Sequence, residues 1–90
     1  MNSRRLKDYS ARHADAAAGL RGWWPAVQAA RWRNFSDVRQ TFNSASYVDP
    51  LVVFNIKGNE YRLVTFIDYD RGLVVLKWFG THAEYDKEQW

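Results

Sequence analysis

Apolar residues in the first third of the chain recur with the period of a helix. Leu6, Tyr9 and His13 are separated by three and four positions, which places them on one stripe of a helix. A second stripe is formed by Leu20, Trp23, Trp24, Val27 and Arg31. The pattern predicts two helices within about residues 3–33.

Short polar residues mark where these helices begin. Asn2 or Ser3 is the expected cap of the first helix, because a short side-chain oxygen accepts a hydrogen bond from a free N–H of the first turn. Asp15 is the expected cap of the second helix. The first helix is therefore predicted to end near His13.

Two later segments depart from the helical pattern. Pro25 lacks an N–H and clashes with the preceding helical turn, so we expect a kink there or a helix that restarts at Trp24. Residues 34–50 are rich in Asn, Ser and Asp and predict a loop. Within it, Ser36 is placed to cap one short turn through Gln40.

After Pro50 the period changes to that of strands. Three runs rich in β-branched and aromatic residues follow, LVVFNIK, EYRLVTFIDY and LVVLKWFGT. Gly-Asn at 58–59 and Asp-Arg-Gly at 70–72 separate them as hairpin turns, and connections this short join antiparallel strands. We predict one α+β domain, with the two N-terminal helices packed on an antiparallel sheet of at least three strands at about 51–80, and a C-terminal turn at 81–90.

Each predicted strand carries a polar or cationic residue on an otherwise apolar side. Asn55 and Lys57 share one side of the first strand, and Arg62 lies on the second. Lys77 shares a side of the third strand with Leu73, Val75 and Phe79. Because adjacent strands lie about 4.8 Å apart, several of these side chains converge if the register brings them level.

Charge is unevenly distributed over the 90 residues. The net charge is +3, but residues 1–33 contribute +5 and residues 34–90 contribute −2. A basic N-terminal third attracts polyanions or an acidic protein partner, or it is simply a solvated helix surface. With 17% aromatic residues, the chain also has enough rings for both a small core and a binding surface.

The stretch GTHAEYD at 80–86 gathers titratable groups directly after the last strand. On a helical turn, His82, Tyr85 and Asp86 share one face. An imidazole gives and takes protons near neutral pH, and an adjacent carboxylate orients or charges it. Alternatively, Thr81 and Glu84 form a capping box for a terminal turn and His82 is an ordinary surface residue.

Several classes of site are excluded by composition. The chain has no Cys, which rules out disulfides and thiolate metal sites. Neither His13 nor His82 has a second His, or a Cys, at ligand spacing, and no nucleotide-binding fingerprint is present, so we expect neither metal nor cofactor. No apolar run approaches the roughly 20 residues of a membrane span, and the N-terminus lacks a signal-peptide core. We expect a cytoplasmic protein without membrane contact.

The chemistry that remains is cleavage of RNA without a metal ion. That reaction needs a base for the 2′-OH proton and an acid for the leaving 5′-oxygen. It also needs cations aimed at the phosphate as negative charge develops. His, Tyr, Arg and Lys supply these groups, and a basic, aromatic surface stacks unpaired bases.

Two segments resemble the HigB toxins of bacterial type II toxin–antitoxin modules, within the RelE/ParE superfamily. They are VFNIKGNEYRLV at 53–64 and THAEYD at 81–86. The resemblance covers nearly the whole chain and includes the N-terminal helix, the tryptophan-containing second helix and WRNFSDVR at 32–39. It implies the α+β fold predicted above and an mRNA endonuclease that acts on messages being translated on the ribosome and inhibits protein synthesis.

The same resemblance implies partners. The first is a cognate helix-turn-helix antitoxin, HigA-like, that is usually encoded beside the toxin. The second is mRNA on the ribosome. Operator DNA is reached only through the antitoxin complex, which represses its own promoter.

Carried over to this sequence, the resemblance implies the following catalytic residues. His82 is the candidate for proton transfer, and Asp86 supports it or holds the terminal turn. Tyr85 stacks on a base or assists proton transfer, and Arg62 stabilises the scissile phosphate. Lys77 stands where the family commonly has a basic residue, often Arg, so the charge is kept and the bidentate fork is lost.

Three further residues surround the first hairpin and are expected to bind RNA, namely Asn55, Lys57 and Asn59. Asn59 is equally well explained as a turn residue, and Arg62 as a structural ion-pair partner. Two other functions also remain open at this level. A ParE-like poison of DNA gyrase has the same fold, and a non-catalytic RNA-binding module would use the basic helices.

Overall fold

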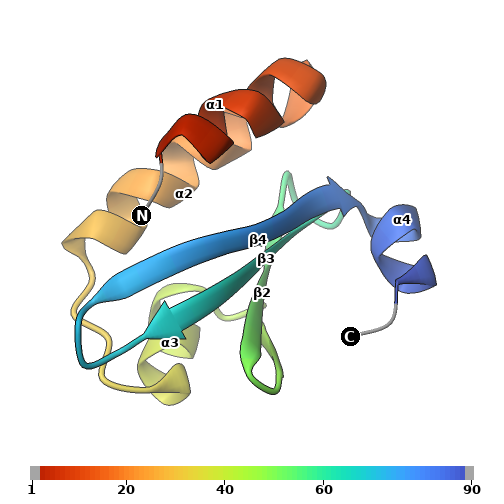
Figure 1. The fold of residues 1–90 in the computed structure, drawn as a ribbon. Coiled ribbons are helices and arrows are strands. Elements are labelled where there is room, and N and C mark those ends of the chain that lie inside the picture. The colour runs from red at the N-terminus through yellow and green to blue at the C-terminus, as the bar shows by residue number, and fades with distance from the viewer. Residues whose placement is uncertain (1–2, 89–90) are drawn as a thin grey trace.

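The computed structural model describes residues 3–88, apart from the side chains of residues 3 and 4. Helices pack against a single antiparallel sheet, which confirms the predicted α+β class (Figure 1). The helical elements are α1 (Ser3–Arg12), the 3₁₀ helix η1 (Ala14–Ala16), α2 (Ala17–Ala29), α3 (Phe35–Thr41) and α4 (His82–Lys87). The strands are β1 (Ser46–Val48), β2 (Leu51–Ile56), β3 (Tyr61–Asp68) and β4 (Leu73–Thr81).

The sheet is a four-stranded meander in the order β1-β2-β3-β4. Its register places Asn55 opposite Arg62 and Arg62 opposite Gly80. The β3–β4 turn contains Gly72 at φ 67°, a left-handed conformation that glycine adopts without steric cost. In the β2–β3 turn, Lys57 also has a positive φ of 53°, beside Gly58 at 64°.

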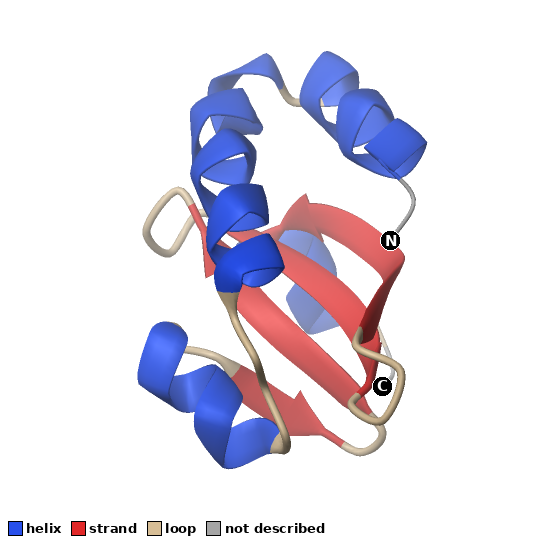
Figure 2. Ribbon diagram, turned by 90° about the vertical axis from the view of Figure 1, so that its left-hand side faces the viewer, coloured by secondary structure: helices blue, strands red, loops and turns tan. Residues whose placement is uncertain are grey.

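The two faces of the sheet have different environments. Figure 2 shows α1 and α2 lying together over one side, here called the helix face. The principal core lies between these helices and the sheet, and its largest fully buried members include Phe54, Leu20, Leu63 and Leu76. The opposite side, here called the outer face, carries Arg62 of β3 and its cross-strand partners, Asn55 of β2 and Gly80 of β4.

The predicted helical stripes face this core. Leu6 and Tyr9 of α1 are buried, as are Leu20, Trp23 and Val27 of α2. Arg31 is exposed beyond the end of α2, which stops at Ala29. The hydrophobic period therefore located both helices, although the second is shorter than the stripe suggested.

Two expectations about α2 are wrong. Asp15 does not cap it, since it lies within η1, and the capping residue Ala16 offers no side-chain hydrogen bond. The helix does not restart at Trp24, because α2 continues through Pro25. Pro25 is exposed, so water can solvate the carbonyl that loses its helical partner. The expected caps of α1 fall outside the described residues (Asn2) or lack a described side chain (Ser3).

The predicted loop at 34–50 contains a helix and a strand. Asn34, rather than Ser36, caps α3, with its Oδ1 accepting a hydrogen bond from the Asp37 N–H at 3.0 Å. Val38 anchors this short helix by complete burial. Beyond α3, β1 pairs with β2 as a fourth strand.

A β-bulge in β4 changes the faces of its residues. Val64 pairs with Trp78 and Thr65 pairs with Leu76, so Lys77 is an extra residue without a partner on β3. Regular alternation predicted that Lys77 shares a side with Phe79. The prediction is wrong, because beyond the bulge Phe79 is buried in the core while Lys77 is exposed.

Candidate functional site

Helix α4 begins at Thr81, where β4 ends, because Thr81 and Glu84 form a capping box. The Thr81 Oγ1 accepts from the Glu84 N–H at 3.1 Å, and the Glu84 Oε1 accepts from the Thr81 N–H at 2.8 Å. The backbone hydrogen bond from Thr81 is the main reason that the pKa of the Glu84 carboxyl is lowered. The His82 N–H also donates to the Glu60 carbonyl at 2.8 Å, which ties α4 to the β2–β3 turn.

The capped helix brings two of the predicted catalytic side chains together. The His82 Nε2 lies 3.4 Å from the Asp86 Oδ2, one turn further along α4. Both side chains are about half exposed, at 46% and 57%. This is an accessible imidazole with an adjacent carboxylate, the arrangement needed to orient or charge it. The capped-turn and chemical interpretations of this stretch are therefore compatible.

Arg62 lies on the outer face near α4, between Asn55 and Gly80 of the neighbouring strands. Its guanidinium donates to Asn59, with Nη2 at 2.8 Å from Oδ1 and Nη1 at 3.2 Å from the carbonyl oxygen. Nη1 also lies 3.2 Å from the Tyr61 carbonyl. Within the described residues Arg62 has no ion pair, so its structural contacts are hydrogen bonds to the hairpin. Asn59 is both a turn residue and the partner of Arg62.

Aromatic rings line the boundary between the outer face and α4. The Trp78 indole lies over Gly80, since a Cβ on Gly80 would be 2.5 Å from the Trp78 Cη2. Tyr85 of α4 lies next to this indole, with ring centroids 6.3 Å apart. The absence of a side chain at Gly80 thus lets an aromatic ring lie next to the position of Arg62.

Two of the predicted residues lie away from this group. Lys57 turns towards η1, where its Nζ is 3.2 Å from the Asp15 Oδ2 and 3.4 Å from the Glu60 Oε2. Lys77 precedes Thr81 by four residues, or roughly 13 Å along β4. It lines a hollow with residues of α1 instead. Of the eight candidate residues, six gather at the α4 end of the sheet: Asn55, Asn59, Arg62, His82, Tyr85 and Asp86.

Sequence reasoning missed a polar cluster behind the hairpin. The Asp15 carboxylate accepts from the Tyr61 hydroxyl at 2.7 Å and from Lys57. The Tyr61 hydrogen bond is the main cause that lowers the pKa of Asp15, and the same bond raises the pKa of Tyr61. His13 packs its ring edge-on against Tyr61 at 5.2 Å. Asp15 reaches these residues only through tertiary packing, so the local sequence carries no signal of it.

A comparison with family profiles identifies the family of the chain. A profile described as HigB toxin, RelE-like toxic component of a toxin–antitoxin system, matches residues 16–88. The chain belongs to the HigB toxin family. The match spans α2, the whole sheet and α4, so it includes every residue of the candidate site. A search of curated proteins finds no match.

Membership of the HigB toxin family confirms the resemblance inferred from sequence and implies an antitoxin partner. No helix within residues 3–88 is long and apolar enough to cross a membrane. In the same range, no three His, Asp or Glu side chains come together as metal ligands would.

Proposed function

We propose that this HigB toxin is a metal-independent endoribonuclease that cleaves mRNA on the ribosome and so inhibits translation in the cytoplasm. The observation that carries the proposal is the His82–Asp86 pair, 3.4 Å apart on α4, at the sheet end where Arg62 lies on the outer face. An accessible imidazole and a nearby guanidinium are the minimal groups for cleavage of RNA by its own 2′-OH.

The reaction is an internal displacement at phosphorus. The 2′-oxygen attacks the adjacent phosphate while its proton passes to a base, and the bond to the 5′-oxygen breaks as that oxygen gains a proton. The products are a 2′,3′-cyclic phosphate and a 5′-hydroxyl end. His82 performs one of these proton transfers, and Asp86, 3.4 Å away, holds the imidazole in place.

Arg62 is proposed to stabilise the charge that builds on the non-bridging oxygens. A guanidinium has five N–H donors, and the hairpin contacts of Arg62 leave part of that set available to a phosphate. Asn59 fixes the direction of the guanidinium, so less side-chain freedom is lost when RNA binds. Asn55, its cross-strand neighbour, offers an amide to a base or ribose.

Tyr85 is proposed to stack on a base beside the scissile phosphate, next to Trp78. Lys57 has a smaller role in this scheme than in the sequence-based assignment, because it is engaged in two ion pairs, one with Asp15 of η1 and one with Glu60 of the hairpin.

The antitoxin partner is proposed to be a HigA-like helix-turn-helix protein that carries the toxin to operator DNA.

The test is to map new mRNA 5′ ends after brief induction of the wild type, His82→Ala and Lys87→Ala. Lys87 lies on the same helix and is exposed, so its variant controls for any general effect of altering α4. The wild type and Lys87→Ala should give ends within codons of translated messages. His82→Ala should lose them by about 100-fold or more, the usual contribution of general acid–base catalysis.

A folded His82→Ala protein that produces the same ends at the same rate would show that the assigned proton-transfer group is wrong. Damage to DNA before translation stops, without new mRNA ends, would show instead that the target is DNA gyrase. RNA binding by purified protein without cleavage on ribosomes would indicate a non-catalytic module.

A further inference from the structure

A hollow of about 340 Å³ lies between α1 and β4, away from α4. Arg5 and Arg12 of α1 and Lys77 of the β4 bulge contribute three cations to its lining, against a single carboxylate, Asp8. No ion pair joins any of these four groups within the described residues. The hollow is thus a concentration of uncompensated positive charge, and it accounts for part of the basic character of the N-terminal third.

The fold holds two of the three cations in place, by different contacts. The Arg5 Nη1 donates to the Leu76 carbonyl at 2.8 Å, which fixes α1 against the exposed edge of β4. The Arg12 guanidinium lies 5.7 Å from the centre of the Tyr9 ring. Lys77 projects from the bulge and makes no hydrogen bond or ion pair in the described structure. Two guanidinium groups are therefore directed by packing, and one ammonium is available.

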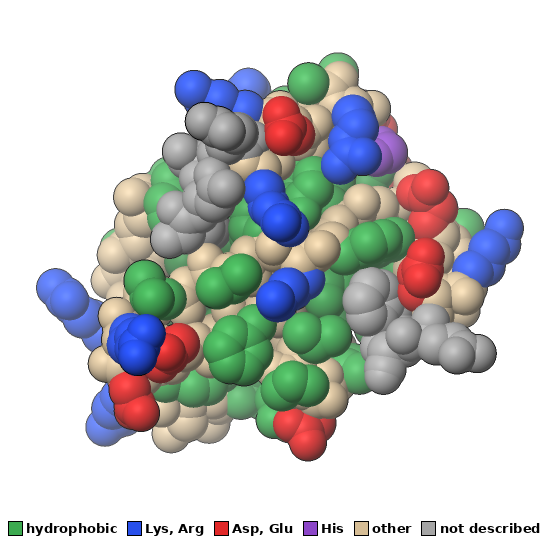
Figure 3. All heavy atoms as spheres, in the orientation of Figure 1, with side chains coloured by type: hydrophobic (Ala, Val, Ile, Leu, Met, Phe, Trp, Pro, Cys, Tyr) green, Lys and Arg blue, Asp and Glu red, His purple; other side chains and the backbone are tan. Residues whose placement is uncertain are grey.

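The outer face beside the hollow is apolar. Phe66 and Val75 face each other across β3 and β4, and they are 37% and 41% exposed. Leu73, at the start of β4, is 43% exposed on the same side. Figure 3 shows this face, with Lys and Arg side chains set among hydrophobic ones. Cations beside the exposed ring of Phe66 suit a ligand with alternating phosphates and bases better than an acidic peptide, which has nothing to place on that ring.

We propose that Arg5, Arg12 and Lys77 form a second anion-binding subsite, which holds phosphodiester groups of single-stranded RNA away from the cleavage position. The proposal rests on RNA as the ligand of this toxin, but not on cleavage. Lys77 and Thr81 are roughly 13 Å apart along the strand, whereas stacked nucleotides advance about 3.4 Å each. The subsite therefore contacts nucleotides several steps from the scissile phosphate, and Lys77 acts in binding.

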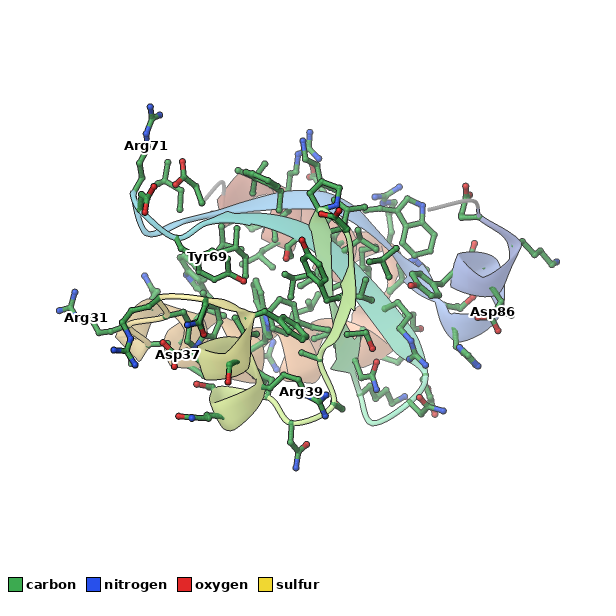
Figure 4. The ribbon with its side chains drawn as sticks, turned by 90° about the horizontal axis from the view of Figure 1, so that it is seen from below. Arg31, Asp37, Arg39, Tyr69, Arg71 and Asp86 are labelled. Carbon is green, nitrogen blue, oxygen red and sulfur yellow. The ribbon has the colours of Figure 1, made fainter. Side chains whose placement is uncertain are left out.

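The test measures binding of a short 2′-O-methyl RNA, which lacks the attacking hydroxyl and cannot be cleaved. Binding to the full chain is followed by fluorescence anisotropy over a range of salt concentrations. The test variant is Arg12→Gln/Lys77→Gln, which removes two charges and keeps side-chain stems. The matched control is Arg31→Gln/Arg39→Gln, which changes two exposed arginines elsewhere. Figure 4 shows Arg31 at the opposite side of the view from Asp86, with Arg39 between them.

The test variant should bind at least about tenfold more weakly near 0.1 M salt. Its plot of log affinity against log salt should be shallower by about 1.4, since each phosphate contact to a single strand contributes about 0.7. The control should change affinity less than about twofold and keep the slope. In cleavage assays on ribosomes, the test variant should raise KM with little change in kcat.

Equal losses of RNA affinity in the two double variants would overturn the proposal, because the affinity would then depend on net charge rather than on a subsite. Unchanged RNA binding by the folded test variant would overturn it as well. So would displacement of the RNA by hexaglutamate at a lower concentration than by unlabelled RNA, which would identify an acidic protein segment as the ligand. Failure of the proposed cleavage function would leave the binding result intact, since the probe reports binding alone.

Discussion

His82 and Asp86 are paired on one face of α4, and both remain accessible to solvent. The pair depends on a helix of only six residues, which the capping box of Thr81 and Glu84 starts at a defined position. A terminal turn of this length is marginal by itself, because most helical stability comes from length and packing. The hydrogen bond from the His82 N–H to the hairpin supplies a further anchor.

Asp86→Asn should lower kcat for mRNA cleavage by about two- to fivefold and leave KM unchanged. The variant keeps a polar group near His82 but removes the charge, and an exposed ion pair is worth roughly 0.2–1 kcal/mol. Steady-state kinetics on ribosome-bound mRNA provides the measurement, with Glu88→Gln as a control for loss of a carboxylate near the same helix end. A loss as large as that of His82→Ala would show that Asp86 contacts the substrate directly.

Gly80→Ala should destabilise the fold by about 1–3 kcal/mol, the usual cost of overpacking. The new Cβ would lie 2.5 Å from the Trp78 Cη2 and 2.8 Å from its Cζ2, so the indole must move from its place beside α4. Gly22→Ala is the control, because no atom lies within 4 Å of its Cβ position on α2. It should stabilise the helix by about 0.5–1 kcal/mol. Urea unfolding gives the change in stability of both variants. If both were destabilised, or both stabilised, by the same amount, the difference in space at the two Cβ positions would not be what determines stability.

Asp15→Asn should lower the free energy of unfolding at neutral pH. The difference from the wild type should become smaller in acid. The Tyr61 hydroxyl and then Lys57 lower the pKa of Asp15, so its contribution is fully present above the unfolded-state pKa of about 3.9. It is lost as the pH falls through the lower folded-state pKa. Urea unfolding of the wild type and variant between pH 7 and pH 2.5 measures the difference.

The control for Asp15→Asn is Asp8→Asn, which removes an exposed carboxylate that has no hydrogen bond or ion pair in the described structure. A difference between wild type and Asp15→Asn that stays constant down to pH 2.5 would show that the bonds to Tyr61 and Lys57 do not stabilise the folded chain.

The parts of the fold that follow from local pattern were predictable from sequence. The helical stripes through Leu6 and Leu20 lie in the core. Gly72 has the positive φ expected of a glycine in the predicted hairpin turn. The sequence predicted α3 only as one short turn and did not predict β1, because each of these elements is short. Their stability comes from contacts such as the burial of Val38 and the pairing of β1 with β2, which composition does not reveal.

The candidate site was predictable where sequence neighbours become spatial neighbours. His82 and Asp86 needed only a helical turn, and Asn55 and Arg62 needed only the hairpin register. Lys57 does not share the side of Asn55 as regular alternation predicted, because it leaves β2 with a positive φ and turns towards Asp15. That partner is separated from it by 42 residues, so only the packed tertiary structure brings them together.

The bulge in β4 has a consequence for chain length. Leu76 and Trp78 already pair with consecutive residues of β3, so the sheet would run without Lys77, and a chain lacking it would keep Trp78, Phe79 and Gly80 on their present faces. A one-residue gap at this point in an alignment of related toxins would therefore leave the α4 end intact and remove only a cation of the α1–β4 hollow. Among related toxins, the α4 end of the sheet can therefore change by substitution, and the α1–β4 hollow can change separately by deletion of a residue.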